Sequence, residues 1–94
     1  MTVRALAMKS FLTEWYQPVS GEGGVGGIAA ALGEAAAGLR EHGQSVQVQL
    51  VVEVSTDEVL YAVFRAESKA AVIEVCTRSG LPVNRITDVQ AFAP

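Results

Sequence analysis

Residues 46–66, VQVQLVVEVSTDEVLYAVFRA, decide the fold, because this stretch is typical of two β-strands joined by a short acidic turn. In the first run, residues 46–54, apolar and more polar side chains alternate with the period of a strand that has one buried face. The second run, residues 59–66, is apolar on both faces, which indicates a central strand with the first run as the edge. The alternation predicts one set of side chains toward the helices and one away from them. The inward set is Val46, Val48, Leu50, Val52 and Val54, and the outward set is Gln47, Gln49, Val51 and Glu53.

Two further strands flank this hairpin in the sequence. Residues 8–16 are rich in β-forming side chains and carry bulky groups on both faces, which favours another central strand. Pro18 ends that strand, because proline has no N–H for a ladder hydrogen bond. Residues 85–92 predict a closing strand, and the imperfect phase of its apolar side chains indicates a β-bulge there.

The segments between these strands predict two helices. A glycine-rich loop at residues 17–27 leads into an amphipathic helix that ends at Gly43, a residue suited to a C-terminal cap. The second helix, residues 69–79, has Ser68 as its expected N-cap. Gly80 begins the Gly-Leu-Pro sequence that stops this helix, because glycine accepts the left-handed conformation of the cap and proline blocks continuation.

The order of these elements is β-α-β-β-α-β, which predicts an α+β ferredoxin-like sandwich. Right-handed crossovers place both helices on one face of a four-stranded antiparallel sheet with strand order 4-1-3-2. At 94 residues the chain fits a single domain, 1–94, with residues 1–7 as a loose lead-in. A single helix layer leaves the other sheet face uncovered. We therefore expect a homodimer in which two such faces meet as a dimeric α/β barrel.

Composition and charge argue against several classes of partner. The net charge is -3 and the seven basic residues are scattered along the chain, which argues against nucleic-acid binding. No segment approaches the ~20 apolar residues that span a bilayer, and the N-terminal run lacks the apolar core of a signal peptide. Cys76 is the only cysteine, so the sequence predicts no disulfide framework. We expect a cytoplasmic protein without nucleic-acid or membrane partners.

Three sequence features invite a functional interpretation. Residues 21–26, GEGGVG, match the GxGxxG pattern, but the preceding strand ends too early for a tight turn, which favours a flexible loop over nucleotide binding. His42 is the only histidine; it is expected to cap the first helix and is only a weak candidate for a metal ligand. Cys76 falls on the apolar face of the second helix, which predicts a buried, unreactive thiol.

The sheet face away from the helices carries the polar groups that predict a ligand site beside apolar surface. On the first and third strands, either of the two alternating sets of side chains could face this side. The alternative is that the polar residues of the edge strand are solvated and discourage aggregation. The candidate ligand-binding residues are Glu14, Tyr16, Gln47, Gln49, Glu53 and Tyr61.

A family resemblance is carried by residues 11–18, FLTEWYQP, and by the segments DEVLYAVFRAES, AAVIEV and SGLPVNRITDV within residues 57–89. These segments resemble a small bacterial family of unknown function that includes a nickel-binding, nickel-responsive protein. The resemblance implies a ferredoxin-like fold that dimerises. It also implies that nickel or another divalent metal is bound through a histidine in the second strand, where this chain has Val51.

Three functions are compatible with these expectations. The first is a non-catalytic homodimer that binds a small molecule, or a metal ion, in the cleft behind the sheet. The second is a small cofactor-free monooxygenase or isomerase of the dimeric α/β-barrel type, in which Glu14, Tyr16 or Tyr61 transfers a proton. The third is a homo-oligomeric assembly module whose second sheet face only pairs with a partner.

Overall fold

The computed structural model describes residues 8–92 and 94, so the predicted lead-in at residues 1–7 lies outside the described part. The predicted β-α-β-β-α-β order of the elements is confirmed. A 3₁₀ turn, Ser55–Asp57, joins the second strand to the third. The elements are β1 (Lys9–Trp15), α1 (Gly24–Glu41), β2 (Val46–Val54), β3 (Val59–Ala66), α2 (Lys69–Arg78) and β4 (Arg85–Val89).

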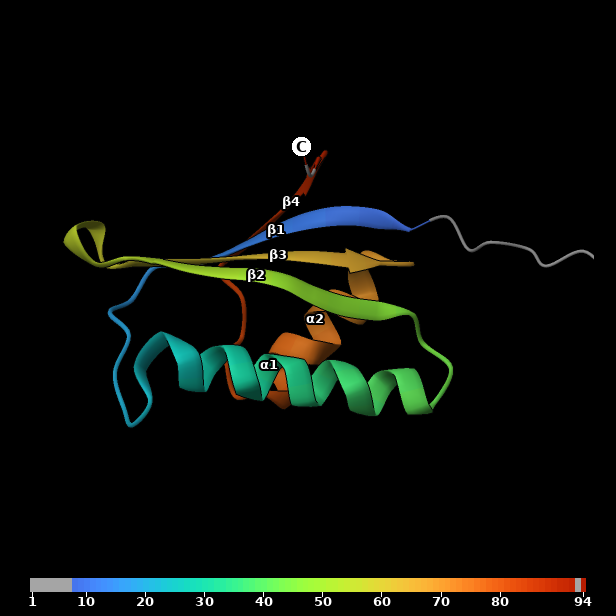
Figure 1. Ribbon diagram of the computed structural model, residues 1–94, viewed down its shortest axis with the longest axis horizontal. Helices are drawn as coiled ribbons and strands as arrows, with labels where there is room; N and C mark the ends of the chain where they lie inside the picture. Colours follow the sequence, from blue (N-terminus) through green and yellow to red (C-terminus); the bar gives the residue numbers. More distant parts are fainter. Residues whose placement is uncertain (1–7, 93) are drawn as a thin grey trace, which may run out of the picture.

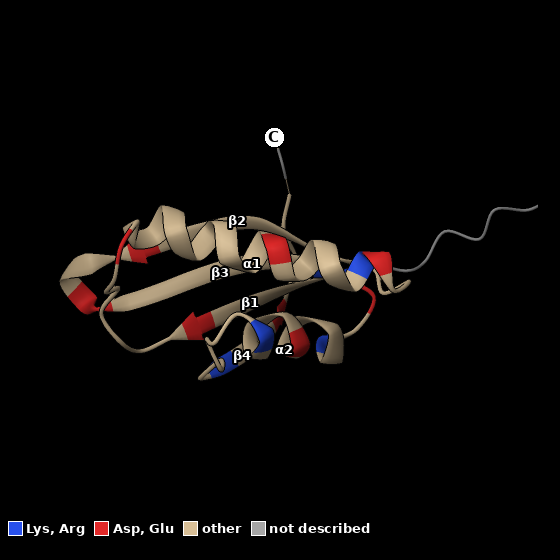
Figure 2. Cartoon of the chain, turned by 90° about the horizontal axis from the view of Figure 1, so that it is seen from below, with Lys and Arg blue, Asp and Glu red and all other residues tan. Residues whose placement is uncertain are grey.

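The four strands form one antiparallel sheet in the order β2-β3-β1-β4, which is the predicted order read from the other edge. Both helices cover the same face of this sheet, and no described element covers the other face (Figure 1). That second face is called the open face below. Figure 2 shows acidic and basic residues interspersed over the helices and strands rather than gathered in one patch. Within the described residues, no helix has both the length and the apolar character needed to cross a membrane.

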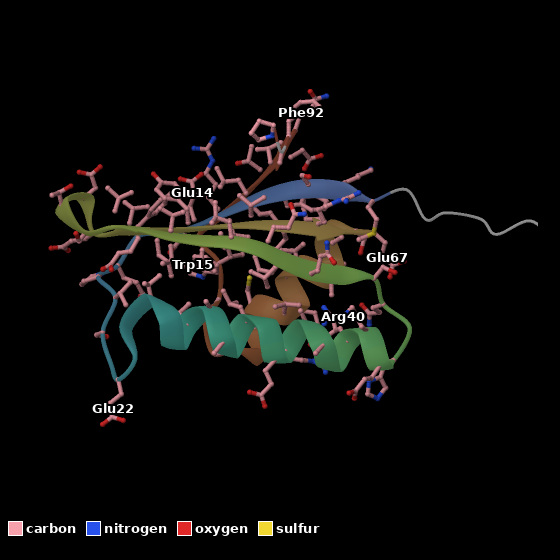
Figure 3. The ribbon with its side chains drawn as sticks, in the orientation of Figure 1. Glu14, Trp15, Glu22, Arg40, Glu67 and Phe92 are labelled. Atoms are coloured by element: carbon pink, nitrogen blue, oxygen red, sulfur yellow. The ribbon has the colours of Figure 1, made fainter. Side chains whose placement is uncertain are left out.

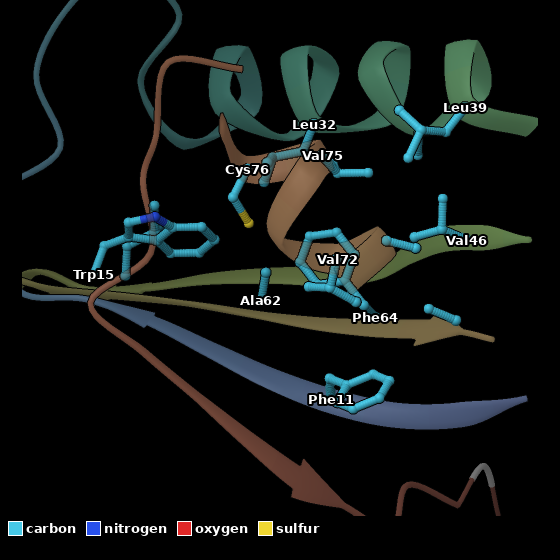
Figure 4. Close-up of a cluster of buried hydrophobic side chains, with 14 residues drawn as sticks. Phe11, Trp15, Leu32, Leu39, Val46, Ala62, Phe64, Val72, Val75 and Cys76 are labelled. Carbon is cyan, nitrogen blue, oxygen red and sulfur yellow. The ribbon is translucent and has the colours of Figure 1, made fainter. Parts of the chain in front are cut away.

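The hydrophobic core lies between the sheet and the two helices (Figure 4). Two buried polar groups are satisfied inside it: the Thr13 hydroxyl donates to the Ala62 carbonyl at 3.1 Å, and the Trp15 indole N–H donates to the Leu81 carbonyl at 2.8 Å. Among the described residues, no buried side-chain nitrogen or oxygen lacks a partner. The largest fully buried side chains are Trp15, Phe11, Phe64, Leu32, Leu39, Val46, Val72, Val75, Thr13 and Cys76.

Both helices end as the sequence predicts, in Schellman motifs. Gly43, with φ 85°, follows α1, and the next backbone N–H donates to the Leu39 carbonyl at 3.1 Å. Gly80, with φ 73°, follows α2, and Leu81 N–H donates to the Cys76 carbonyl at 2.9 Å. The left-handed conformation favours glycine at both positions because glycine has no Cβ.

The glycine-rich segment differs from its prediction. The loop was expected to extend through residue 27, but α1 begins at Gly24, so residues 24–27 form its first turn. Gly23 takes φ 84°, and its carbonyl accepts a hydrogen bond from Gly27 N–H at 3.0 Å. A Cβ on Gly27 would lie 2.9 Å from the Glu22 carbonyl oxygen. Glycine here lets the incoming chain pass close to the helix, which is a structural role.

Alanine substitutions should separate the glycines of α1 into two kinds. Gly27→Ala is expected to lower the free energy of unfolding by about 1–3 kcal/mol, because its Cβ meets backbone that cannot easily move. Gly33→Ala should raise it by about 0.5–1 kcal/mol, because a Cβ there meets nothing within 4 Å and alanine favours the helix. Urea unfolding followed by circular dichroism measures both. Equal effects of the two substitutions would contradict the close approach at Gly27.

The β-bulge lies in β2 and not in the closing strand. Val48 pairs with Phe64, but Leu50 pairs with Val63, so Gln49 is an extra residue in β2. The closing strand ends at Val89, three residues before its predicted end. A bulge of this kind moves every following side chain to the opposite face of the sheet.

The predicted faces of β2 are therefore wrong after residue 48. Val51 pairs with buried Ala62, so it faces the helices and packs against the core. Glu53 pairs with buried Leu60 and lies on the same side of the sheet, although its side chain is exposed. Leu50 and Val52 face the open side instead and are 55% and 40% exposed. The open face is consequently more apolar than the sequence pattern predicts.

Candidate functional site

The open face combines apolar side chains from β1, β2 and β3 with polar and charged side chains. Register places its side chains in rows, because residues directly opposite each other in antiparallel strands point to the same side. One row contains Leu50, Val63, Leu12 and Thr87, in strand order. The neighbouring row contains Val52, Tyr61, Glu14 and Arg85.

Glu14 is the acidic centre of this face. Tyr16 donates its hydroxyl to Glu14 Oε1 at 3.0 Å, and Arg85 Nε lies 3.7 Å from Glu14 Oε2. The Glu14 side chain is only 13% exposed, whereas that of Arg85 is 65% exposed. Figure 3 shows Glu14 on the open side of the sheet, with the adjacent Trp15 directed toward the helices. Glu14, Tyr16, Tyr61 and Arg85 are called the Glu14 cluster below.

Backbone hydrogen bonds hold the Glu14 cluster in place at one end of the sheet. Asn84 N–H donates to the Glu14 carbonyl at 3.1 Å, and Tyr16 N–H donates to the Asn84 side-chain oxygen at 3.0 Å. Trp15, between them in sequence, is buried and fixed by its bond to the Leu81 carbonyl. The alternation of β1 thus anchors one side chain in the core and presents its two neighbours to the open face.

The phenol of Tyr16 is a hydrogen-bond donor at neutral pH. Desolvation and the hydrogen bond to Glu14 both raise the pKa of Tyr16 above its ordinary value, and the nearby Arg85 lowers it by less. The protonated phenol can therefore stabilise the Glu14 carboxylate but is poorly suited to act as a base. The Glu14 carboxylate oxygens can accept further hydrogen bonds, and apolar side chains lie nearby. This combination suits a ligand that carries a hydrogen-bond donor.

The predicted site residues separate in the structure. Glu14, Tyr16 and Tyr61 come together on the open face, which resolves the question of which set of β1 and β3 side chains faces that side. Gln47 lies on the open face toward the other end, opposite Arg65.

The remaining two predicted site residues lie elsewhere. Gln49 is the bulge residue. Glu53 was predicted to face away from the helices, and this was wrong because the bulge reverses its side.

The other two singled-out residues have structural roles. His42 is the C-cap of α1, as predicted, and its Nδ1 lies 2.9 Å from the Gly38 carbonyl. Cys76 is fully buried, also as predicted, and burial raises the pKa of its thiol to about 12, so the reactive thiolate is scarce at neutral pH. In residues 8–92 and 94, no group of three His, Cys, Asp or Glu side chains is arranged to hold a metal ion.

A groove of about 920 Å³ occupies the end of the open face away from the Glu14 cluster. The sheet supplies Leu50, Val63 and Arg65, and the segment after β4 supplies the opposite wall with residues 90–92. Sequence reasoning missed Arg65, Arg85 and Phe92. Arg85 follows the Gly-Leu-Pro stop at the start of a strand, but its pairing with Glu14 depends on register between strands distant in sequence.

No protein-family model matches the chain, and no curated protein is significantly similar to it in sequence. The structure is similar to the crystal structure of SCO4226 from Streptomyces coelicolor A3(2), with a TM-score of 0.63. The match has 16% sequence identity and covers 89% of this chain and 99% of that chain. It supports the class of fold: an α+β domain with a four-stranded antiparallel sheet and two helices, compatible with a ferredoxin-like fold.

Proposed function

We propose that the protein is a non-catalytic homodimer that binds a small molecule between two facing open faces. One observation carries the proposal: the open face exposes the large apolar side chains Leu50 and Val52 on β2, and two strands away it holds a carboxylate that is itself mostly buried, Glu14. A purely solvated sheet face would have polar side chains where Leu50, Val63 and Leu12 lie side by side. Large exposed apolar patches mark interaction surfaces.

The apolar rows supply the dimer contact. Two sheets that pack face to face lie ~10 Å apart and interdigitate their side chains. Such packing would bury the exposed side chains of Leu50 and Val52 on the edge strand. It would also complete the burial of Leu12 and Val63, which are half-buried in the single chain, and so form the apolar core of an interface. A twofold arrangement uses the same surface on both copies, which suits a single self-complementary face.

The Glu14 cluster supplies the ligand contact. Its carboxylate already accepts one hydrogen bond from Tyr16 and lies near Arg85, and a second copy would remove more water from it. A buried carboxylate requires additional hydrogen bonds. The ligand class that provides them is a small molecule with an amine, amide or hydroxyl donor on an apolar frame.

Nickel binding, which the family resemblance implied, does not fit the described residues of one chain. Val51 stands where the family has its strand histidine, and it faces the core rather than the open side. Among the described residues, no group of three His, Cys, Asp or Glu side chains is arranged to hold a metal ion, and Glu14 on the open face already accepts a hydrogen bond from Tyr16. The monooxygenase or isomerase alternative would use the same cluster, and the turnover arm of the screen described next tests it.

Thermal-shift screening of amines, amides and alcohols with apolar rings tests the ligand proposal. Compounds that bind should raise the melting temperature of the wild type and of Glu34→Gln, a control on the exposed side of α1. They should fail to stabilise Glu14→Gln, which retains the shape of the side chain but loses the charge. Nickel should stabilise none of the three proteins. Hits that stabilise Glu14→Gln as well as the wild type would overturn the assignment of this site, and chemical turnover of a hit would favour the enzyme alternative.

A further inference from the structure

The segment that follows β4 leaves the sheet on the open side. β4 ends at Val89, and the chain then rises away from the helices toward its C-terminal end (Figure 1). Phe92 lies on this segment, and its side chain projects from the molecule (Figure 3). It is 87% exposed, the highest value among the large exposed apolar side chains of the described residues. Residues 90–92 are called the C-terminal arm below.

The groove beside the arm has an apolar part that Phe92 does not fill. Leu50, Val63 and Val89 form this part, and polar side chains such as Arg65 and Gln49 line the rest. Phe92 contributes only to its outer wall, since the ring remains 87% exposed. The same chain therefore carries an exposed aromatic side chain and, next to it, a groove of about 920 Å³ with an apolar part.

The area of the open face explains why a dimer would use the arm. Strands of this length give a four-stranded face of only about 450 Å² in plane, at ~3.3 Å per residue and ~4.8 Å between strands. A stable interface removes about 800 Å² from each partner. A phenylalanine side chain adds roughly 150–250 Å² when it is buried. The arm would therefore add a substantial share to the area that the sheet face can bury.

We propose that each C-terminal arm reaches across the dimer and seats Phe92 in the groove of the partner copy, against Leu50 and Val63. The inference rests on the proposed facing-sheet dimer and names the segment that locks it. The occupant is a second copy of this chain because the exchange is reciprocal: each copy provides one aromatic side chain and one groove. Phe92 then becomes an anchor residue of the kind that dominates interface energetics.

Sedimentation equilibrium on the wild type, Phe92→Asp and Ile73→Asp tests the exchange. Ile73 is 42% exposed on α2, on the far side of the sheet from the open face, and serves as the matched control. Phe92→Asp should raise the dimer dissociation constant at least tenfold with an unchanged melting temperature of the monomer, while Ile73→Asp should leave the constant unchanged. A wild-type dimer that Phe92→Asp does not weaken overturns the arm exchange and leaves the facing-sheet dimer intact. A monomeric wild type overturns both.

Cross-linking identifies the contact directly. Phe92→Cys and Leu50→Cys are prepared as separate chains, mixed and treated with a short bismaleimide. Native Cys76 does not interfere, because it is fully buried and its pKa is raised to about 12. The exchange predicts cross-linked pairs in the mixture that contain one chain of each kind, at higher yield than in either variant alone. Equal yields in the mixture and in the separate variants would contradict it.

Discussion

Leu50→Asp is expected to convert the proposed dimer to monomers without unfolding the chain. Leu50 is 55% exposed on the open face, so a carboxylate there stays hydrated in the single chain. In the proposed interface the same carboxylate would lose water without a partner. A cost of about 3 kcal/mol raises the dissociation constant more than 100-fold.

Val51→Asp is the matched control for this prediction because it changes the adjacent residue. Val51 faces the helices and packs against the core, so a carboxylate there should destabilise the fold by about 3 kcal/mol or more. Melting temperature and sedimentation velocity distinguish the two outcomes. If Leu50→Asp unfolds the chain and Val51→Asp does not, the uninterrupted alternation of residues 46–54 is correct and the bulge at Gln49 is wrong.

Phe64→Ala should cause a large loss of stability. Phe64 is fully buried on the central strand β3, with Val48 and Phe11 as its cross-strand partners. Truncation leaves a cavity between the sheet and the helices, and such changes cost about 3–5 kcal/mol. That is a large part of the 5–15 kcal/mol that typically stabilises a domain.

Urea unfolding at one fixed chain concentration measures the effect of Phe64→Ala. Tyr16→Phe is a suitable control, because it changes an aromatic residue that is 53% exposed and removes only the hydroxyl bonded to Glu14. Its effect should be within about 1 kcal/mol. A loss below 1 kcal/mol for Phe64→Ala would contradict the position of this ring at the centre of the core.

Local signals predicted most of the fold. The ends of both helices follow from Gly43 and Gly80, since a left-handed cap depends on the glycine and on the residues directly beside it. The bounds of β2 and β3 were predicted in full from apolar periodicity. The start of α1 was not, because the first turn of a helix tolerates glycine when tertiary contacts hold it, and glycine content alone indicated a loop.

The candidate site was only partly predictable, for a physical reason. Glu14 and Tyr61 are polar or amphipathic side chains on two strands that the sequence predicts to be neighbours. In the structure these two residues lie directly opposite each other. Glu53 was selected by alternation, which a single bulge reverses. Residues 50–52, Leu-Val-Val, fit either face of a strand, so the sequence pattern did not locate the bulge.

Phe92 illustrates the same limit at the end of the chain. The apolar spacing of residues 85–92 favours a strand that continues through Phe92. Pairing with β1 stops at Val89, opposite Ser10, so nothing in the described sheet holds the residues that follow. Phe92 lies beyond the last residue pair of the sheet. Tertiary structure decides whether such a side chain packs on its own chain, and the apolar periodicity of the sequence contains no information about this.

Sedimentation equilibrium of the untagged wild type tests the central proposal, that the open face joins two copies. The facing-sheet dimer predicts a mass of about twice the 9.9 kDa of one chain at micromolar concentrations. It further predicts that Leu50→Asp returns the mass to that of one chain. A single-chain mass for the wild type at every concentration up to hundreds of micromolar would contradict the account.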